Sequence, residues 1–498
     1  MIKFSNVFIK FYIRKMFRSK IPVIYVSALF FGVVSWFTAY GQVNRELDHF
    51  VYHYWINKNV PSVSVGVLSK GKIVYQDAVG YSDLENTTLA NPKTIYRIAS
   101  ISKSITAVAI MQLYEKGKID LDADVRKYIP YFPKKKWKFT IRQLLSHTAG
   151  IRNYHDNEFD SKDYYRSTRD AVNCILNDPL EFEPGTKYLY TTLGYNLLAA
   201  VIENVTKIPF TDYLKKYIFE PAGMTSTLPE YHKDIIRNRA HGYEKNIYRK
   251  FENAPLSDLS LKFAGGGLIS NTEDMLKFAS CLINGKLIRN STLDIMTSPV
   301  KLKNGQELGY SLGFSAGKDN KERRYITHSG SGTGFVSNLL IYPDENCAFV
   351  CLVNCKEKSH DNLAFQLASL YLDKSRIIPK ILLSDRLMGI YYNSGIDSAL
   401  NHYYRIKKDS LEYFVFSPEE VSSFGNDLIS IWKIPDAIKL FKLMVSDYPN
   451  NPKSYAGLAD AYYKDNNKGL AVKNYRISIK LDPHNSYASD MIKKLERL

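Results

Sequence analysis

The stretch YRIASISKS, at residues 96–104, opens an apolar run that reaches Leu113. If this run is a helix, Ser100 and Lys103 share one face, one turn from each other. A serine hydroxyl is a weak nucleophile until a neighbouring group takes its proton, and a lysine can do so where burial keeps its amine neutral. Unpaired N–H groups at the helix start also favour negative charge near Ser100. Taken alone, however, Ser-x-x-Lys is more often an N-cap serine with a solvated lysine.

Length and charge describe a basic globular chain of several domains. Its 498 residues exceed one ordinary core, so two or more domains are expected. The net charge is +17, and the chain stays basic when the strongly basic segment at 1–20 is set aside. Such a surface suits anionic envelopes or substrates. No zinc-finger spacing, RNP-like stretch or basic helix supports nucleic-acid binding, so none is expected.

The segment at 1–41 has the pattern of a targeting sequence. A basic stretch precedes the apolar run from Ile21 to Phe37, and Ala39 and Gly41 supply small residues for a cleavage site. An uncleaved anchor that associates with a membrane through residues 21–41 fits as well, and a mitochondrial presequence is a third interpretation. We therefore expect residues 1–41 to be a signal peptide or membrane anchor. The protein is expected to be exported, either periplasmic or membrane-anchored and facing away from the cytosol.

Residues 42–375 alternate between strand and helix patterns. Two apolar stretches flank Ser69-Lys70-Gly71-Lys72, which predicts a β-hairpin. Besides the run after Ser100, helices are expected at 141–150, from about Leu193, and after a cap at Asn271 or Thr272. The last third of the domain predicts an antiparallel meander. Its expected strands are residues 309–314, 325–330, 335–342 and 348–353.

The C-terminal segment at 419–498 contains an internal repeat with a period of about 34, the length of a tetratricopeptide helix pair. Small and large apolar residues recur at this spacing, and a proline closes each unit. The matched pairs are Phe424/Leu458, Gly425/Ala459, Leu428/Tyr462, Ala437/Ala471, Phe441/Tyr475 and Pro449/Pro483. Two units bury little surface alone, so they are expected to pack on the preceding residues or on a partner. The expected divisions are a helical linker at 376–418 and the repeats at 419–498.

Three short motifs occur in a fixed order: Ser100-x-x-Lys103, Tyr190-x-Thr192 and His328-Ser329-Gly330. Together with LLSHTAG at 144–150 and AGGG at 264–267, they resemble the serine beta-lactamase and penicillin-binding-protein family. The resemblance is to its class C, DD-peptidase and esterase branch and covers about residues 45–372. The ordered combination is far more specific than any one motif.

The resemblance implies a role for each matched residue. Ser100 would be the acylated nucleophile, Lys103 its base or orienting partner, and Tyr190 a proton shuttle acting as phenolate or phenol. Which of Lys103 and Tyr190 takes the proton in acylation stays open. His328 would form the opposite wall of the site with Ser329 and Gly330. The backbone N–H groups of Ser331 and Ser100 would form an oxyanion hole.

One position departs from the usual family pattern. Thr192 stands where most relatives have asparagine, and its hydroxyl is shorter and donates a single hydrogen to substrate. The Tyr-x-Thr pattern and the run from Ser146 to Tyr154 look like those of the mitochondrial serine beta-lactamase-like members, which implies a peptidase or a filament-forming protein. Efficient antibiotic hydrolysis is therefore not expected. His147 is interpreted as a structural residue at a helix end.

We therefore expect an α/β (α+β) domain of beta-lactamase/transpeptidase-like fold. Its antiparallel sheet would be flanked by helices with an all-α lobe, Ser100 would lie at their junction, and a helical tail would follow. The expected function is hydrolysis of amides or esters through a covalent acyl-enzyme, on D-amino-acid peptides, peptidoglycan-type substrates, beta-lactams or small esters. No metal or organic cofactor is expected. The alternative is a weakly active binding protein that recruits a protein partner through its tail.

Overall fold

The computed structural model describes residues 44–155, 157–356 and 363–497, so the expected targeting segment at 1–41 lies outside the described residues. The chain divides into two units, Met1–His49 and Phe50–Leu498. Of the first unit only residues 44–49 are described, and these are helical. Within the described ranges, no helix combines the length and apolar character needed to cross a membrane.

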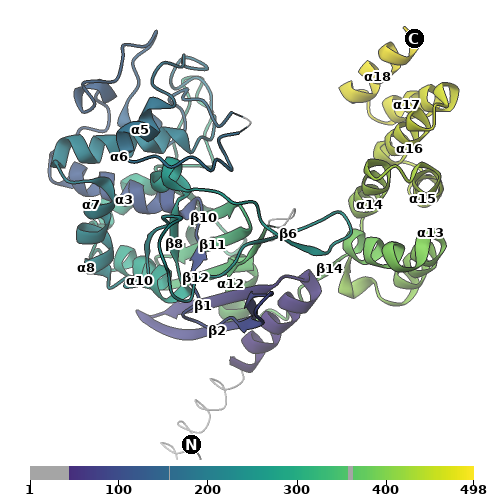
Figure 1. Cartoon of the computed structure of the whole chain (residues 1–498), viewed down its shortest axis with the longest axis horizontal. Coiled ribbons are helices and arrows are strands. Elements are labelled where there is room, and N and C mark those ends of the chain that lie inside the picture. Colours follow the sequence, from purple (N-terminus) through teal and green to yellow (C-terminus); the bar gives the residue numbers. More distant parts are fainter. Residues whose placement is uncertain (1–43, 156, 357–362, 498) are drawn as a thin grey trace, which may run out of the picture. The chain divides into compact units, whose positions relative to one another are not determined.

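A seven-stranded antiparallel sheet forms the centre of the hydrolase-like domain, in the order β3-β2-β1-β12-β11-β10-β9 (Figure 1). The predicted hairpin joins β1 and β2, and the predicted meander supplies β10, β11 and β12. β1, β11 and β12 are buried along their whole length, as expected of central strands covered on both faces. The prediction of a mixed α/β domain with an antiparallel sheet is confirmed.

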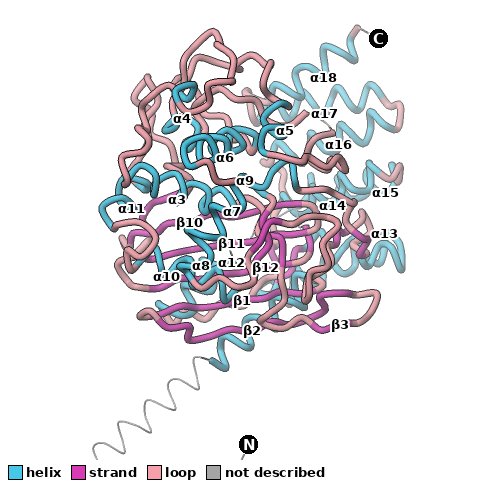
Figure 2. The backbone as a smooth tube through the Cα atoms, turned by 60° about the vertical axis from the view of Figure 1, so that its left-hand side comes forward, coloured by secondary structure: helices cyan, strands magenta, loops and turns pink. Residues whose placement is uncertain are grey.

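Helices cover both faces of this sheet (Figure 2). Gly66 of β1 faces α10, where an added Cβ would lie 2.8 Å from the Leu276 side chain. Phe349 of β12 points to the other face and packs against Tyr371 of α12, with ring centroids 6.0 Å apart. The missing side chain at Gly66 thus lets α10 approach the sheet closely.

The strands have the following bounds: β1 Ser62–Ser69, β2 Lys72–Asp83, β3 Thr88–Leu89, β4 Tyr96–Arg97, β5 Leu228–Pro229, β6 Tyr243–Lys245, β7 Phe251–Asn253, β8 Leu268–Ser270, β9 Ser315–Lys318, β10 Arg324–Gly332, β11 Phe335–Tyr342, β12 Cys347–Val353, β13 Cys355–Lys356, β14 Ile381–Leu382 and β15 Phe414–Val415. The α-helices of the first domain are α3 Ile101–Glu115, α4 Ile141–Leu145, α5 Thr168–Asn173, α6 Leu193–Thr206, α7 Phe210–Leu214, α8 Glu220–Ala222, α9 Phe263–Gly266, α10 Thr272–Ile283, α11 Asn290–Thr297 and α12 Leu363–Asp373.

The expected strand at 309–314 is wrong, because this segment is a loop that folds onto α3. Gly313 has a φ of +85°, and a Cβ there would lie 2.3 Å from the Cβ of Ala107. The N–H of Ser311 bonds to the carbonyl of Phe314 within the loop. A close approach that only glycine allows therefore replaces the extended conformation, and the edge strand β9 begins at Ser315.

The C-terminal region is mainly helical, as expected, and α13 of this region precedes the short strand β15. Its helices are α13 Leu383–Asp409, α14 Pro418–Ser430, α15 Ile434–Asp447, α16 Pro452–Lys464, α17 Lys468–Leu481 and α18 Ser486–Glu496. The period of the sequence repeat reappears in the structure, since the step from the start of α14 to the start of α16 equals the step from α15 to α17. α13 and the following helices bury one common apolar core. The repeats therefore pack on the residues that precede them.

Small residues at the helix crossings make this packing possible. The Phe441 ring of α15 lies against Gly425 of α14 and Gly457 of α16, and a Cβ at Gly457 would come within 2.1 Å of the ring. The ring thus fills the space that two glycines leave open.

We expect Gly457→Ala to destabilise the helical region by about 1–3 kcal/mol, because the added methyl must displace Phe441. Gly389→Ala on α13 is the matched control, since a Cβ there meets nothing within 4 Å. In a helix interior it should stabilise by about 0.5–1 kcal/mol. Denaturant unfolding of the full chain, followed by circular dichroism, measures both. Shifts of the same sign would contradict this account.

Candidate active site

The site is built around the start of α3, a helix buried on every side from Ile101 to Leu113. Ser100 is its N-cap residue, and the N–H groups of Ile101 and Ser102 donate to the carbonyl oxygens of Ile98 and Ala99 in the turn before it. Ala99 has a φ of +43°, a conformation that costs energy for a residue with a side chain. The turn from β4 into α3 therefore presents Ser100 in a fixed, strained geometry.

Lys103 lies one turn along α3, with its side chain fully buried. Its Nζ lies 3.0 Å from Ser100 Oγ, 3.1 Å from Thr192 Oγ1 and 2.6 Å from the carbonyl oxygen of Gly265. Burial holds the pKa of this amine well below its usual value, and the charge of Lys262 lowers it further. Its surroundings therefore favour the neutral form of Lys103.

A neutral amine has two N–H groups and one lone pair, which matches these three partners. The carbonyl oxygen of Gly265 can only accept, so it takes one N–H. Thr192 Oγ1 takes the second, and the lone pair is then directed at the hydroxyl of Ser100. All three partners can accept from Lys103, but when the amine is neutral its lone pair is left for Ser100 and can take the proton of the hydroxyl.

Tyr190 lies on the loop before α6, as predicted, and covers Lys103, whose Nζ is 4.7 Å from the ring centroid. Burial raises the pKa of its hydroxyl, and a hydrogen bond with Ser100 only partly opposes this. Burial therefore favours the neutral phenol over the phenolate. Thr192 caps α6 and lines the same cavity, but its hydroxyl is engaged by Lys103.

His328 is a buried residue of strand β10 and makes two hydrogen bonds. Its Nδ1 lies 2.6 Å from the carbonyl oxygen of Ser329, so this nitrogen carries the hydrogen. Nε2 then accepts from the Tyr310 hydroxyl at 2.9 Å. Burial, together with the charge that Lys103 carries when protonated, lowers the pKa of His328 to about 3, so the ring stays neutral at physiological pH. His328 therefore holds Tyr310 in place by a hydrogen bond and is not itself among the residues that line the active-site cavity described below.

Strand β10 crosses closely over the start of α3. A Cβ at Gly330 would lie 2.4 Å from the Ile98 carbonyl oxygen and 3.0 Å from the backbone nitrogen of Ser100. Ser331 and Gly332 line the cavity beside Ser100, whereas Ser329 is exposed on the strand and does not. The glycine at 330 is thus required by the close approach of two backbones.

His147 is buried directly after the end of α4, where the sequence predicted a structural residue, and its ring packs against the site. Its ring is 4.3 Å from that of Tyr190 and 4.8 Å from that of Tyr310. Nδ1 accepts from the N–H of Thr191, so the hydrogen is on Nε2, which has no partner among the described residues. The LLSHTAG run was the available signal, but only the fold shows that it packs on Tyr190.

The catalytic candidates open into a cavity of about 180 Å³. Its lining adds residues that the sequence did not single out, and these include the cationic side chains Arg97 and Lys262. The cavity is lined by Arg97, Ala99, Ser100, Asn153, Tyr154, Phe159, Tyr190, Thr192, Leu259, Lys262, Gly265, Gly266, Ser331, Gly332 and Thr333. Ser100, Tyr190, Thr192 and Ser331 therefore share one enclosed space.

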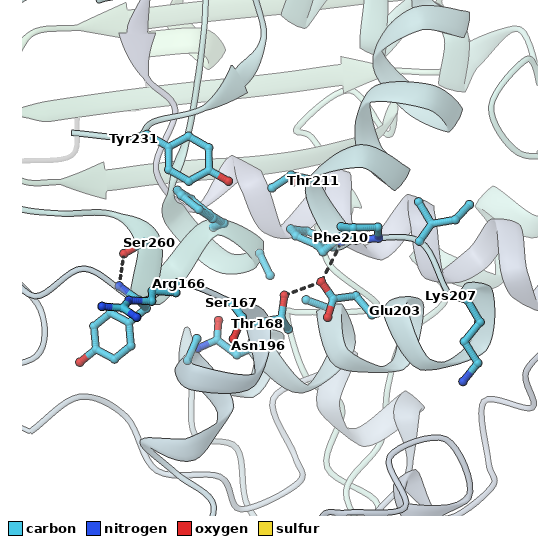
Figure 3. A pocket seen from close by; sticks show the side chains of 17 residues that line it. Arg166, Ser167, Thr168, Asn196, Glu203, Lys207, Phe210, Thr211, Tyr231 and Ser260 are labelled. Carbon is cyan, nitrogen blue, oxygen red and sulfur yellow. Dashed lines mark hydrogen bonds between the residues drawn. The ribbon is translucent and has the colours of Figure 1, made fainter. Parts of the chain in front are cut away.

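A larger cavity of about 540 Å³ lies beyond α9, lined partly by α5, α6 and α7 (Figure 3). The carboxylate of Glu203 in its lining already has partners within the protein, since it accepts from Thr168 Oγ1 at 2.7 Å and from the N–H of Phe210 at 2.8 Å. Ala264 borders this cavity, whereas the next residue, Gly265, borders the smaller one. The larger cavity holds none of the predicted site residues. Within the described ranges, no cluster of His, Cys, Asp or Glu could hold a metal ion.

A serine hydroxyl beside a neutral lysine amine, with a tyrosine phenol above them, is the arrangement of a serine-hydrolase-like site on a transpeptidase-like fold. The comparison with known proteins agrees. Residues 47–372 match the Beta-lactamase family, and the chain belongs to this family.

Two relatives and one solved structure are similar to this chain. Human mitochondrial serine beta-lactamase-like protein LACTB is 31% identical over 379 residues, which cover 57% of this chain and 69% of that protein. A penicillin-binding protein of Bacillus subtilis is 28% identical over 303 residues, covering 58% of this chain and 66% of the relative. The D-amino acid amidase of Ochrobactrum anthropi superposes with a TM-score of 0.58 at 21% identity, covering 67% and 98% of the two chains. The expected fold class is thereby confirmed.

We expect Lys103 to titrate well below the other lysines, because its burial disfavours the charged form. It should be neutral above that lowered pKa and become protonated only as the pH falls through it. An NMR titration with lysine labelled at Cε measures this, and Lys103→Met assigns the resonance. A Lys103 signal that titrates near the ordinary lysine value of 10.5 would contradict the neutral amine.

Proposed function

We propose that the protein is a serine hydrolase that cleaves amide or ester bonds through a covalent acyl-enzyme on Ser100. The observation that supports this most directly is the 3.0 Å contact between Ser100 Oγ and a fully buried Lys103 amine. A solvated lysine could not accept the serine proton near neutral pH, whereas a buried neutral one can.

In the acylation step, Ser100 Oγ attacks the substrate carbonyl carbon and its proton passes to Lys103 Nζ. The carbonyl oxygen becomes an oxyanion, which accepts hydrogen bonds from the backbone N–H groups of Ser100 and Ser331. Tyr190 gives its proton to the leaving nitrogen or oxygen as the bond to carbon breaks, and it regains a proton from the Lys103 ammonium. Ester and free leaving group are then formed, and Lys103 is neutral again.

Deacylation reverses these proton movements. Water attacks the acyl carbon of the ester, and its proton is taken by the Tyr190 and Lys103 pair. The bond from carbon to Ser100 Oγ breaks, and the serine oxygen regains its proton from the same pair. His328 and Tyr310 hold the wall of the site, with neither group titrating in this cycle.

For substrates we propose D-amino-acid peptides or peptidoglycan-type fragments first, and small esters second. A D-amino acid amidase shares the fold, and a penicillin-binding protein is among the relatives. Beta-lactams rank lower, because the Thr192 hydroxyl is bonded to Lys103 and offers substrate less than a free amide would.

The helical region supports a second role, as the site where a protein partner binds through tetratricopeptide-type repeats. The regular spacing of its helices and the exposed Trp432 side chain, 70% accessible, favour this proposal. If the hydrolase-like domain only binds, Ser100→Ala should leave the cellular effect intact while Trp432→Asp removes it.

We also propose that the protein is exported, on the basis of the apolar run at 21–37. A reporter fused to residues 1–41 would test this proposal.

A fluorescent fluorophosphonate should label the protein through Ser100, because this reagent reacts only with activated serine hydroxyls. Ser100→Ala should abolish the labelling, and Lys103→Met should lower its rate at least about 100-fold by removing the base. Ser291→Ala, at an exposed serine on α11, is the control that should label normally. Labelling that persists in Ser100→Ala, or is absent from the wild type, would overturn the proposed function.

Tyr190→Phe should slow amide cleavage by about 10²- to 10⁴-fold, because the leaving amine then lacks its proton donor. The rate of cleavage of a nitrophenyl ester should fall much less, since nitrophenolate leaves without being protonated. The ratio of kcat/KM for the two substrates, in wild type and variant, measures this difference. Equal losses on both substrates would show that Tyr190 does not protonate the leaving group.

A further inference from the structure

One charged lysine lies in the proposed catalytic cavity without a role in the proton transfers described above. Lys262 immediately precedes α9, the short helix whose Gly265 carbonyl holds Lys103. Its side chain lines the same cavity as Ser100 and the residue is only 5% exposed. A buried cation this close to a reacting centre is costly unless something pairs with it.

Within the protein, Lys262 is only partly satisfied. Its Nζ donates to the carbonyl oxygen of Phe159 and lies 4.4 Å from the centroid of that ring. An ammonium has three N–H groups, so two remain for other acceptors. The described residues place no carboxylate in an ion pair with it, although Asp160 acts on it from outside the cavity. The Thr333 hydroxyl donates to Asp160 instead.

The other cation of the cavity is already neutralised. Arg97 forms an ion pair with Glu230 at 2.6 Å and also donates to the Thr333 carbonyl. Lys262, by contrast, keeps its charge near neutral pH, because burial lowers its pKa only to about 8. Among the described residues that line the cavity, Lys262 is therefore an unpaired positive charge beside the neutral Lys103.

We propose that Lys262 binds an anionic group on the acyl portion of the substrate, so that the site selects acidic acyl chains. Residues 331–333 run from the oxyanion hole along the same cavity, so the chain that carries the carbonyl would lie beside them. A carboxylate on that chain would supply the acceptor that Lys262 lacks. This inference rests on the proposed function, since it concerns the substrate of the same site.

Two activated esters that differ by one charge test the proposal. They are the mono-4-nitrophenyl ester of adipic acid and its methyl ester, in which the free carboxylate is capped. At pH 7 the wild type should prefer the free acid at least about tenfold in kcat/KM. Lys262→Met should remove that preference and Lys262→Arg should retain it. Lys286→Met, at an exposed lysine, should leave the ratio unchanged.

The ratio is the readout because replacing Lys262 also removes a charge that lowers the pKa of Lys103, and this change affects the hydrolysis of both esters. A wild-type ratio of one or less, or a preference that survives in a folded Lys262→Met protein, would overturn the inference while leaving the hydrolase intact. If neither ester is hydrolysed in a Ser100-dependent way, the proposed function fails, and the inference with it. The outcomes are therefore distinguishable.

Discussion

The site depends on keeping the Lys103 amine out of water. A buried ammonium would be costly, so the protein holds the neutral form and supplies partners for its two hydrogens and lone pair. The Gly265 carbonyl and the Thr192 hydroxyl fix the amine, which leaves Ser100 as the group that can lose a proton. Sheet, helical lobe and the loop carrying Tyr190 all meet at this point, so the fold is needed to exclude the solvent.

Close packing around the amine explains why small residues gather there. A Cβ at Gly265 would come within 2.6 Å of the Thr192 side chain, and one at Gly330 would strike the Ile98 carbonyl. Because both glycines lack a side chain, neighbouring segments can pack closely next to the nucleophile. The same constraint accounts for the left-handed Ala99, because the turn must bring Ser100 under β10 and still begin α3.

The sequence predicted correctly those features that depend on residues close together along the chain. Ser100 and Lys103 follow from one helical turn, and the hairpin and meander follow from alternation of apolar residues. The loop at 309–314 could not be foreseen, because its shape is set by Ala107 on a distant helix. Lys262 was missed for the same reason, because its place in the cavity depends on residues far along the chain and nothing local marks it. The packing of His147 on Tyr190 likewise depends on the fold.

Two lysines of one site can favour opposite protonation states because their surroundings differ. Lys103 has only neutral partners, so its proton has no compensating charge, whereas Asp160 and Glu230 act favourably on the proton of Lys262. The charge on Lys262 in turn opposes a second positive charge on Lys103. An anion bound to Lys262 would weaken that repulsion, and the acidic substrate would thereby ease the protonation that Lys103 undergoes when Ser100 is acylated.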